Sequence, residues 1–333
     1  MDSSDSSVSQ RTSIKSGAIA LWAVAMTGTG IFANAREGST VYFTKDISSS
    51  GLTRIYEKLM QGRVLPGKVA VKLHSGEPGG HNYPAPALIK DLVQSVNGTI
   101  VECNTAYSGK RFNTADHLVA IKDHGFMEIA PVDVMDEHGS ISLPFPQGKN
   151  ITENFVGANF AKYDSFLILS HFKGHAMAGF GGALKNVSIG IASGEGKMWI
   201  HTAGASRALG NFSRCYRTKK ETFMESMAEA AGSVIEKLGT DRIVYVSLMN
   251  NLSIDCDCDS HPTQPELDDI GILASFDPVA LDCACVDLIY AADSEKSASL
   301  RKRIESRNGG HVLDYAEFLG LGRQQYTLVG IDA

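Results

Sequence analysis

The chain has 333 residues, of which 43% are apolar and 20% charged, and its formal net charge is −6. This composition is that of an ordinary soluble globular protein with one large domain or two modest ones. Lysine and arginine do not gather into a run. Nothing therefore favours a nucleic-acid partner, whose binding surface would be a basic patch.

Residues 1–35 differ in composition from the rest of the chain. Arg11 and Lys15 precede an uncharged, mostly apolar run at residues 17–32, and the small-x-small pattern Ala-Asn-Ala follows at residues 33–35. This order predicts a cleaved signal peptide, because the apolar run is short for a membrane span. A buried N-terminal helix or a weak membrane anchor would give a similar pattern. We expect an exported protein without an integral span after processing if the signal peptide is real, and a cytoplasmic one otherwise.

From residue 36 on, short runs rich in β-branched residues alternate with amphipathic runs. We expect strands at residues 41–44, 68–74, 99–104, 131–136, 165–171, 242–250 and 271–275, and helices at residues 52–60, 86–96, 114–124, 220–238 and 278–290. This alternation predicts an α/β fold with a mostly parallel sheet flanked by helices. The Gly/Pro-rich segment at residues 143–150 is the candidate boundary between two coupled lobes, residues 36–148 and 149–333.

Three of the expected strands end in segments that are dense in reactive residues. Ligands bind to open parallel sheets at the carboxyl ends of the strands, where the loops converge. The first segment, residues 72–84, contains His74, Glu77 and His81. Histidine is easily poised for proton transfer or metal ligation at neutral pH. The alternative is a Gly/Pro turn with solvent-exposed histidines.

The second segment, residues 170–201, is rich in glycine, histidine and lysine. Its glycines in the loop after the strand are Gly174, Gly179, Gly181 and Gly182. Such a loop lets the backbone approach a ligand closely and offers N–H groups to an anion such as phosphate. Lys173 and Lys185 supply cations, and a lysine in a partly dry site is also a nucleophile. The glycine spacing matches neither a dinucleotide-binding fingerprint nor a P-loop. The alternative is a structural turn with solvated lysines.

The third segment, residues 253–262, alternates aspartate and cysteine. Side chains two apart share a face of an extended backbone, so we expect Cys256 and Cys258 on one face and the aspartates on the other. Thiolates together with the imidazole of His261 suit zinc, iron or nickel. A polar loop with two inert cysteines is the alternative. The sequence has no C-x-x-C-x-x-C run, and hence no ferredoxin-type cluster site.

Five segments, in this order, resemble the uncharacterised family known as domain of unknown function 362, whose members are often described as iron–sulfur-centre proteins. They are VAVKLHSGEPGG (69–80), ECNTAYSGKRFNTADHL (102–118), the glycine-rich residues 170–197, DCDCDSHP (255–262) and DIGILASFDPVALDCAC (269–285). Many members carry a two-cluster ferredoxin insert after the counterpart of His201. This chain continues without it into the helix expected at residues 220–238, so the resemblance does not imply such clusters here.

A local pattern is similar to the core motif of the nickel-pincer lactate racemases. In that family a histidine, a lysine ten residues later and a second histidine sixteen residues further on line the site, and His175, Lys185 and His201 keep both intervals. The resemblance implies that His175 is a catalytic acid/base, that Lys185 tethers a pyridinium-derived pincer cofactor and that His201 is a nickel ligand. Gly181 stands where the racemases have serine.

Together these features predict an enzyme of the racemase, epimerase or oxidoreductase type that acts on a small anionic substrate. Its cofactor would be a divalent metal ion (nickel, iron or zinc), with or without an organic group tethered to lysine. We expect Lys173 and Arg111 to bind the anionic end of the substrate, and His74 or His81 to exchange a proton opposite His175.

Two alternatives remain open at this point. A metal- or cofactor-binding carrier or chaperone would use Cys256, Cys258 and His261 without turnover. A degenerate member of the family would keep the scaffold for ligand binding only. The substrate, the metal and the oligomeric state do not follow from the sequence.

Overall fold

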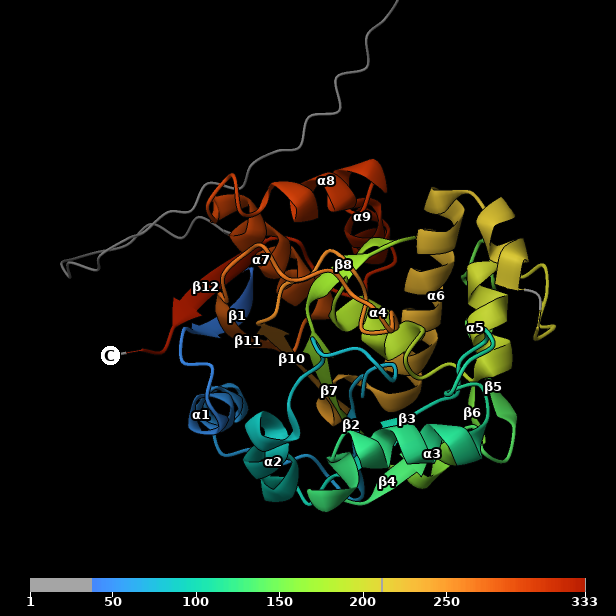
Figure 1. Ribbon diagram of the computed structural model, residues 1–333, viewed down its shortest axis with the longest axis horizontal. Helices are drawn as coiled ribbons and strands as arrows, with labels where there is room; N and C mark the ends of the chain where they lie inside the picture. Colours follow the sequence, from blue (N-terminus) through green and yellow to red (C-terminus); the bar gives the residue numbers. More distant parts are fainter. Residues whose placement is uncertain (1–37, 211, 333) are drawn as a thin grey trace, which may run out of the picture. The chain divides into compact units, whose positions relative to one another are not determined.

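The computed structural model describes residues 38–210 and 212–332 (Figure 1). The expected signal peptide at residues 1–35 lies outside this part of the chain. Among the helices that the structure describes, none has the length and apolar character that crossing a membrane requires.

An eight-stranded sheet runs in the order β12-β1-β11-β10-β7-β2-β3-β4. Its strands are β1 (Ser39–Thr44), β2 (Val69–Lys72), β3 (Thr99–Glu102), β4 (Val132–Val134), β7 (Ser165–His171), β10 (Ile243–Met249), β11 (Gly271–Ser275) and β12 (Tyr326–Gly330). Strand β11 is antiparallel to both of its neighbours, and the other five pairs are parallel. The prediction of an α/β fold with a mostly parallel sheet is confirmed.

Strands from both halves of the chain share this sheet. Strand β2 pairs with β7, so backbone hydrogen bonds cross between residues 36–148 and 149–333. The segment at residues 143–150 falls in an antiparallel hairpin formed by β5 (Ser140–Pro144) and β6 (Glu153–Gly157). The two halves are therefore coupled through the sheet itself.

Helices cover both faces of the sheet (Figure 1). On one face lie α1 (Ser49–Met60), α2 (Pro86–Ser95) and α3 (Thr114–Asp123); on the other lie α4 (Ala183–Ser188), α6 (Lys220–Leu238), α7 (Pro278–Ala291), α8 (Ala298–Ser306) and α9 (His311–Phe318). Strand β7 contributes apolar side chains to the cores on both faces of the sheet. Leu167 and Leu169 pack in the first core, whereas Phe166 and Ile168 pack in the second. A parallel strand buried on both faces is apolar without interruption for this reason.

Local sequence signals determine where helices α7 and α1 begin. Asp277 is the N-cap of α7, and its Oδ1 accepts hydrogen bonds from the N–H groups of Val279 and Ala280, each at 2.9 Å. Pro278 occupies the first helical position, where a backbone N–H has no acceptor within the helix. The missing N–H of proline therefore removes no helical hydrogen bond. Helix α1 begins three residues before the expected start, because Ser48 caps it by accepting from the N–H of Gly51 at 3.0 Å.

The site is built at one edge of the sheet. Strands β2, β3, β7 and β10 are parallel, so the segments that follow them leave from the same edge. The segment after β7 forms a small hairpin of β8 (Lys173–His175) and β9 (Gly179–Gly181) and then the short helix α4. Helix α5 (Gly194–His201) follows α4. The sequence patterns did not predict these short elements.

Candidate functional site

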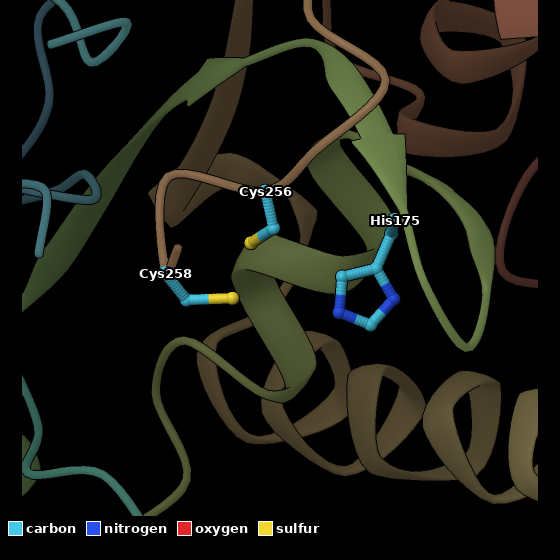
Figure 2. A group of neighbouring side chains, drawn as sticks. All are labelled: His175, Cys256 and Cys258. Carbon is cyan, nitrogen blue, oxygen red and sulfur yellow. The ribbon is translucent and has the colours of Figure 1, made fainter. Parts of the chain in front are cut away.

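Cys256, Cys258 and His175 form a cluster beyond the carboxyl ends of β7 and β10 (Figure 2). One nitrogen of His175 and the two sulfur atoms all lie within 4.8 Å of one another. The cluster borders a pocket of about 330 Å³. The residues that line this pocket are His175, Ala176, Asp255, Cys256, Cys258, Asp259 and Ser260. Two sulfur ligands beside a pocket suit a soft metal ion with room for a further ligand.

The two cysteines meet through a turn and not through an extended backbone. The N–H of Asp259 donates to the carbonyl of Cys256 at 2.8 Å, which closes the turn. Asp257, between the cysteines, points into the protein and is buried. Asp259 is exposed, and Asp255 is held by Thr263 at 2.6 Å. The three aspartates therefore do not share one carboxylate face, because the turn separates them.

The two thiols differ in their tendency to lose a proton. A hydrogen bond from Cys258, together with the ammonium groups of Lys185 and Lys173, lowers the pKa of Cys256 to about 5 against the effect of burial. The pKa of Cys258 is well above its ordinary value, because it donates that hydrogen bond and is buried. At neutral pH the pair is a thiolate and a thiol that share a proton, and a metal that binds both sulfurs would displace it.

Lys185, on α4, is the unpaired cation of the site. Its Nζ lies 4.0 Å from the Sγ of Cys256, and no carboxylate lies within ion-pair distance of it in the described part of the chain. Three neighbouring cations do have such a partner. These pairs are Lys72–Glu102 at 2.9 Å, Arg111–Glu77 at 2.8 Å and Lys173–Asp257 at 2.7 Å. Of the residues expected to bind an anionic end, Lys173 and Arg111 are thus already paired, and Lys185 is the one left free for a ligand.

The hydrogen bonds of His175 and His201 fix different tautomers. The Nδ1 of His175 accepts from the N–H groups of Met177 and Ala178 at 3.3 and 3.0 Å. In the neutral ring the proton is then on Nε2, the nitrogen that faces the sulfurs in Figure 2. The Nδ1 of His201 instead faces the carbonyl of Lys197 at 2.6 Å. It must donate there, so its Nε2 carries a lone pair, as in metal-bound histidines.

Both histidines are neutral at ordinary pH. Burial and the charges of Lys185, His201 and Lys173 hold the pKa of His175 well below its usual value. Burial lowers the pKa of His201 to about 4, against the hydrogen bond to Lys197. His201 stacks on Phe223 with the ring centroids 4.8 Å apart. It does not belong to the group of ligand atoms within 4.8 Å that contains His175 and the two cysteines.

Apart from His171, which is buried, the remaining histidines of the three segments divide into one near the site and two at the surface. His74 is surrounded by cations, and burial together with Arg111 and Lys173 holds its pKa well below the usual value. His81 is exposed and contacts Gln264 at 2.9 Å. His261 is also exposed, with its Nδ1 2.9 Å from the hydroxyl of Ser260. Because its ring turns to the surface, His261 is not brought together with the cysteines.

The glycine-rich loop does not offer an anion site at the start of α4. The carboxylate of Asp282, on α7, accepts hydrogen bonds from the N–H groups of Ala183 and Leu184 at 2.7 and 2.9 Å. A Cβ on Gly182 would lie 2.2 Å from the Oδ1 of Asp282. A buried carboxylate of the chain thus already occupies these two N–H groups, and the binding role expected for Gly179, Gly181 and Gly182 stays a prediction. The absence of a Cβ at Gly182 leaves room for the Asp282 carboxylate to reach these N–H groups.

Gly179 and Gly181 of the same loop have distinct roles. Gly179 has a φ of +84° and packs against Gly309 and Ile304, so it shapes the hairpin. Gly181 leaves space beside the lysines: a Cβ there would lie 3.3 Å from the Cδ of Lys185. A side chain at position 181 would thus press on the free cation of the site.

A buried ion cluster beside the site was missed in the sequence. Lys72 and Glu102 are 1% and 3% exposed at the ends of β2 and β3. The Oε1 of Glu102 also accepts from the N–H and hydroxyl of Ser75 at 2.7 and 2.9 Å. Although burial would raise it, Lys72, His117 and Arg111 hold the pKa of Glu102 at about 2. The available signal was a charged residue within an apolar strand, since a buried charge requires a partner.

The chain is similar to one protein family and to several solved structures. The sequence profile of the family "Domain of unknown function (DUF362)" matches residues 69–287. Comparison with the curated proteins finds no match. One similar solved structure is that of the lactate racemase apoprotein from Thermoanaerobacterium thermosaccharolyticum, with 13% identity, a TM-score of 0.40, and coverage of 78% of this chain and 59% of that one. Another is a protein from Thermotoga maritima, with 14% identity, a TM-score of 0.39, and coverage of 78% and 58%.

This chain spans less than two thirds of the length of either structural relative. The family match covers most of the chain and includes the segments that build the site, from β2 to α7. The chain belongs to the DUF362 family, which confirms the resemblance found in the sequence.

Proposed function

We propose that this member of the DUF362 family is a metal-dependent enzyme that acts on a small anionic substrate at the pocket beside Cys256, Cys258 and His175. The observation that carries the proposal is the close approach of one imidazole and two sulfur atoms at the wall of a pocket of about 330 Å³. Two thiolates bind nickel, iron or zinc, and the pocket leaves an open position on the metal for a substrate.

In this proposal His175 is an acid/base and not a metal ligand. Its Nε2 could bind a metal only if the ring proton moved to Nδ1, where it would point at the two N–H groups of Met177 and Ala178. Both hydrogen bonds would be lost, at a cost of about 1–3 kcal/mol for each buried group left unpaired. With its proton on Nε2, the neutral ring donates to an oxygen of a substrate bound beside the sulfurs.

Lys185 is the proposed partner for the anionic group of the substrate. It is the cation of the site without a carboxylate, and it lies within reach of the thiolate of Cys256. An anion placed between Lys185 and the metal would be held by charge at both ends. His74 is the proposed second proton carrier.

Two features also fit the lysine-tethered nickel cofactor that the racemase resemblance implies. The amine of Lys185 is free of a carboxylate, and the Nε2 lone pair of His201 is available as a ligand. The space at Gly181 lies beside the Lys185 side chain. Such a group, when bound, supplies a hydride acceptor or a sink for a carbanion. Lys185 would hold it, His201 would ligate its metal, and His175 would move the proton.

The test is metal analysis together with intact mass, on protein purified from its source organism. We expect about one equivalent of a transition metal per chain, lost in Cys256→Ser. A mass increase that maps to Lys185 would identify a tethered cofactor. The absence of both metal and adduct would refute the proposed function.

Turnover separates an enzyme from a carrier. The loaded protein is assayed for inversion or oxidation of a panel of 2-hydroxy acids, and His175→Ala is the matched variant. Loss of turnover in His175→Ala with metal content unchanged supports the enzyme. A protein that binds metal, turns over no substrate and releases its metal to a competing chelator is a carrier.

A further inference from the structure

We propose that Asp257 is a positioning residue that sets the geometry of the Cys256–Cys258 site through a buried cluster with His171 and Lys173. This inference rests on the proposed function, and it concerns side chains that contact neither the metal nor the substrate.

The cluster joins two charged groups and one imidazole away from solvent. The carboxylate of Asp257 lies 2.9 and 3.0 Å from the Nδ1 of His171 and 2.7 Å from the Nζ of Lys173. The side chains of His171, Lys173 and Asp257 are 0%, 7% and 1% exposed. Ion pairs at this depth are strong only where the geometry is good and the hydrogen-bonding capacity is used, and both conditions hold here.

The ring of His171 has a hydrogen-bond partner at each nitrogen. Its Nδ1 faces the carboxylate of Asp257, and its Nε2 lies 2.6 Å from the carbonyl of Asn250. Lys173 holds the same carboxylate from β8, the strand that follows β7. The side chain of Asp257 is therefore held from two neighbouring segments of the chain.

The backbone of the turn is fixed from the other side as well. The carbonyl of Asp257 accepts from the N–H of Glu77 at 2.8 Å, and the carbonyl of Ser253 accepts from the N–H of Gly174 at 2.8 Å. A Cβ on Gly174 would lie 2.2 Å from the carbonyl oxygen of Ile254, so the turn lies directly against β8. With its side chain and its carbonyl both held, Asp257 leaves the flanking sulfurs little freedom. Because the two sulfurs are already positioned, metal binding does not require the turn to become ordered first.

The chain offers a matched pair of variants for the test. Asp257→Asn keeps the shape of the side chain and removes its charge. Asp268→Asn makes the same change at a carboxylate that does not line the pocket, where the side chain is 78% exposed and pairs with Lys296. The probe is Co²⁺ added to the metal-free full chain, since its thiolate charge-transfer and ligand-field absorption report the number and geometry of the sulfur ligands.

We expect Asp257→Asn to weaken Co²⁺ binding by at least about tenfold and to alter the absorption spectrum, as removal of partners behind a metal ligand does. Asp268→Asn should match the unmodified chain in both. Circular dichroism verifies folding, and Lys173→Met, which removes one cation of the cluster, serves as an independent variant with the same expected change.

The proposal is overturned if Asp257→Asn and Lys173→Met are folded and bind Co²⁺ with the affinity and spectrum of the unmodified chain. If the unmodified chain itself gives no thiolate charge-transfer band, the metal function fails as well. The spectrum of the unmodified chain therefore shows whether only the positioning role of Asp257 has failed or the metal function as well.

Discussion

The Nζ of Lys185 lies 4.0 Å from the Sγ of Cys256, and this contact joins two segments that follow different strands of the sheet. Lys185 comes from α4, after β7, whereas Cys256 follows β10. The ammonium stabilises the thiolate, and the thiolate is the charge that holds the ammonium at the pocket. An anionic ligand would compete for the lysine, and a metal ion would compete for the sulfur.

The first prediction concerns the pH dependence of Cys256 alkylation in the metal-free protein. Iodoacetamide reacts with the thiolate, so its rate should rise with pH through about 5 and then level off. An ordinary thiol would show its midpoint near about 8.5. Lys185→Met removes a charge that favours the thiolate and should therefore move the midpoint upward. Mass spectrometry of the alkylated Cys256 peptide at a series of pH values measures the midpoint in the unmodified chain and in Lys185→Met.

The control for this experiment is Lys149→Met, because the side chain of Lys149 is 68% exposed and pairs with Glu225 away from the site. It should leave the midpoint unchanged. A midpoint near that of an ordinary thiol in the unmodified chain would contradict the prediction.

The second prediction separates the ligand role of His175 from its acid/base role. His175→Ala should change the affinity for Co²⁺ by less than about threefold, because the two sulfurs remain. Cys256→Ser should abolish the thiolate charge-transfer band. His81→Ala, at an exposed histidine, is the control. If His175→Ala lost Co²⁺ as fully as Cys256→Ser, the ring would have to be a ligand and the tautomer argument would be wrong.

The course of the chain followed from local sequence patterns to a large extent. The almost continuous apolar run at residues 165–171 predicted a central parallel strand, and β7 has these bounds. Helix α6 spans residues 220–238 as its periodicity predicts. The sequence could not predict that β11 runs antiparallel, because the apolar pattern of a doubly buried strand is the same in either direction.

The site was predicted in outline, since the three reactive segments do meet at one edge of the sheet. Its details depend on contacts that no local pattern contains. The carboxylate that caps α4 comes from Asp282, 98 or 99 residues away along the chain from the N–H groups it binds. Whether His175 or His201 carries a lone pair toward the site depends on which ring nitrogen meets a backbone donor and which meets a carbonyl. The spacing of residues in the sequence predicts neither the Asp282 cap nor the histidine tautomers.

The third prediction tests the role of Gly182. A Cβ there would lie 2.2 Å from the Oδ1 of Asp282, although the φ of −138° is open to any residue. Gly182→Ala should lower the free energy of unfolding by about 2–4 kcal/mol, through overpacking and loss of the cap on α4. Urea unfolding measures this change. Gly310→Ala is the control, because nothing lies within 4 Å of its Cβ and its φ is −62°; its effect should stay within about 0.5 kcal/mol. Equal stabilities of the two variants would refute the steric argument.

The last prediction concerns the buried pair Lys72–Glu102. Glu102→Gln leaves the ammonium of Lys72 buried without its carboxylate, so the free energy of unfolding at neutral pH should fall by about 3–5 kcal/mol. The matched control is Asp268→Asn in the Lys296–Asp268 pair, whose side chains are 50% and 78% exposed. Loss of an exposed pair should cost no more than about 1 kcal/mol.

The same variant has a distinct pH dependence. The pKa of Glu102 is about 2 in the folded chain and 4.5 ordinarily, so the unfolded chain binds more protons at pH values between these two. The stability that ionised Glu102 contributes is therefore complete above pH 4.5 and is lost as the pH falls toward 2. Glu102→Gln has no such contribution to lose, so its stability should fall less steeply with acid over this range. Parallel acid limbs of the two unfolding curves would show that Glu102 is not held ionised by Lys72.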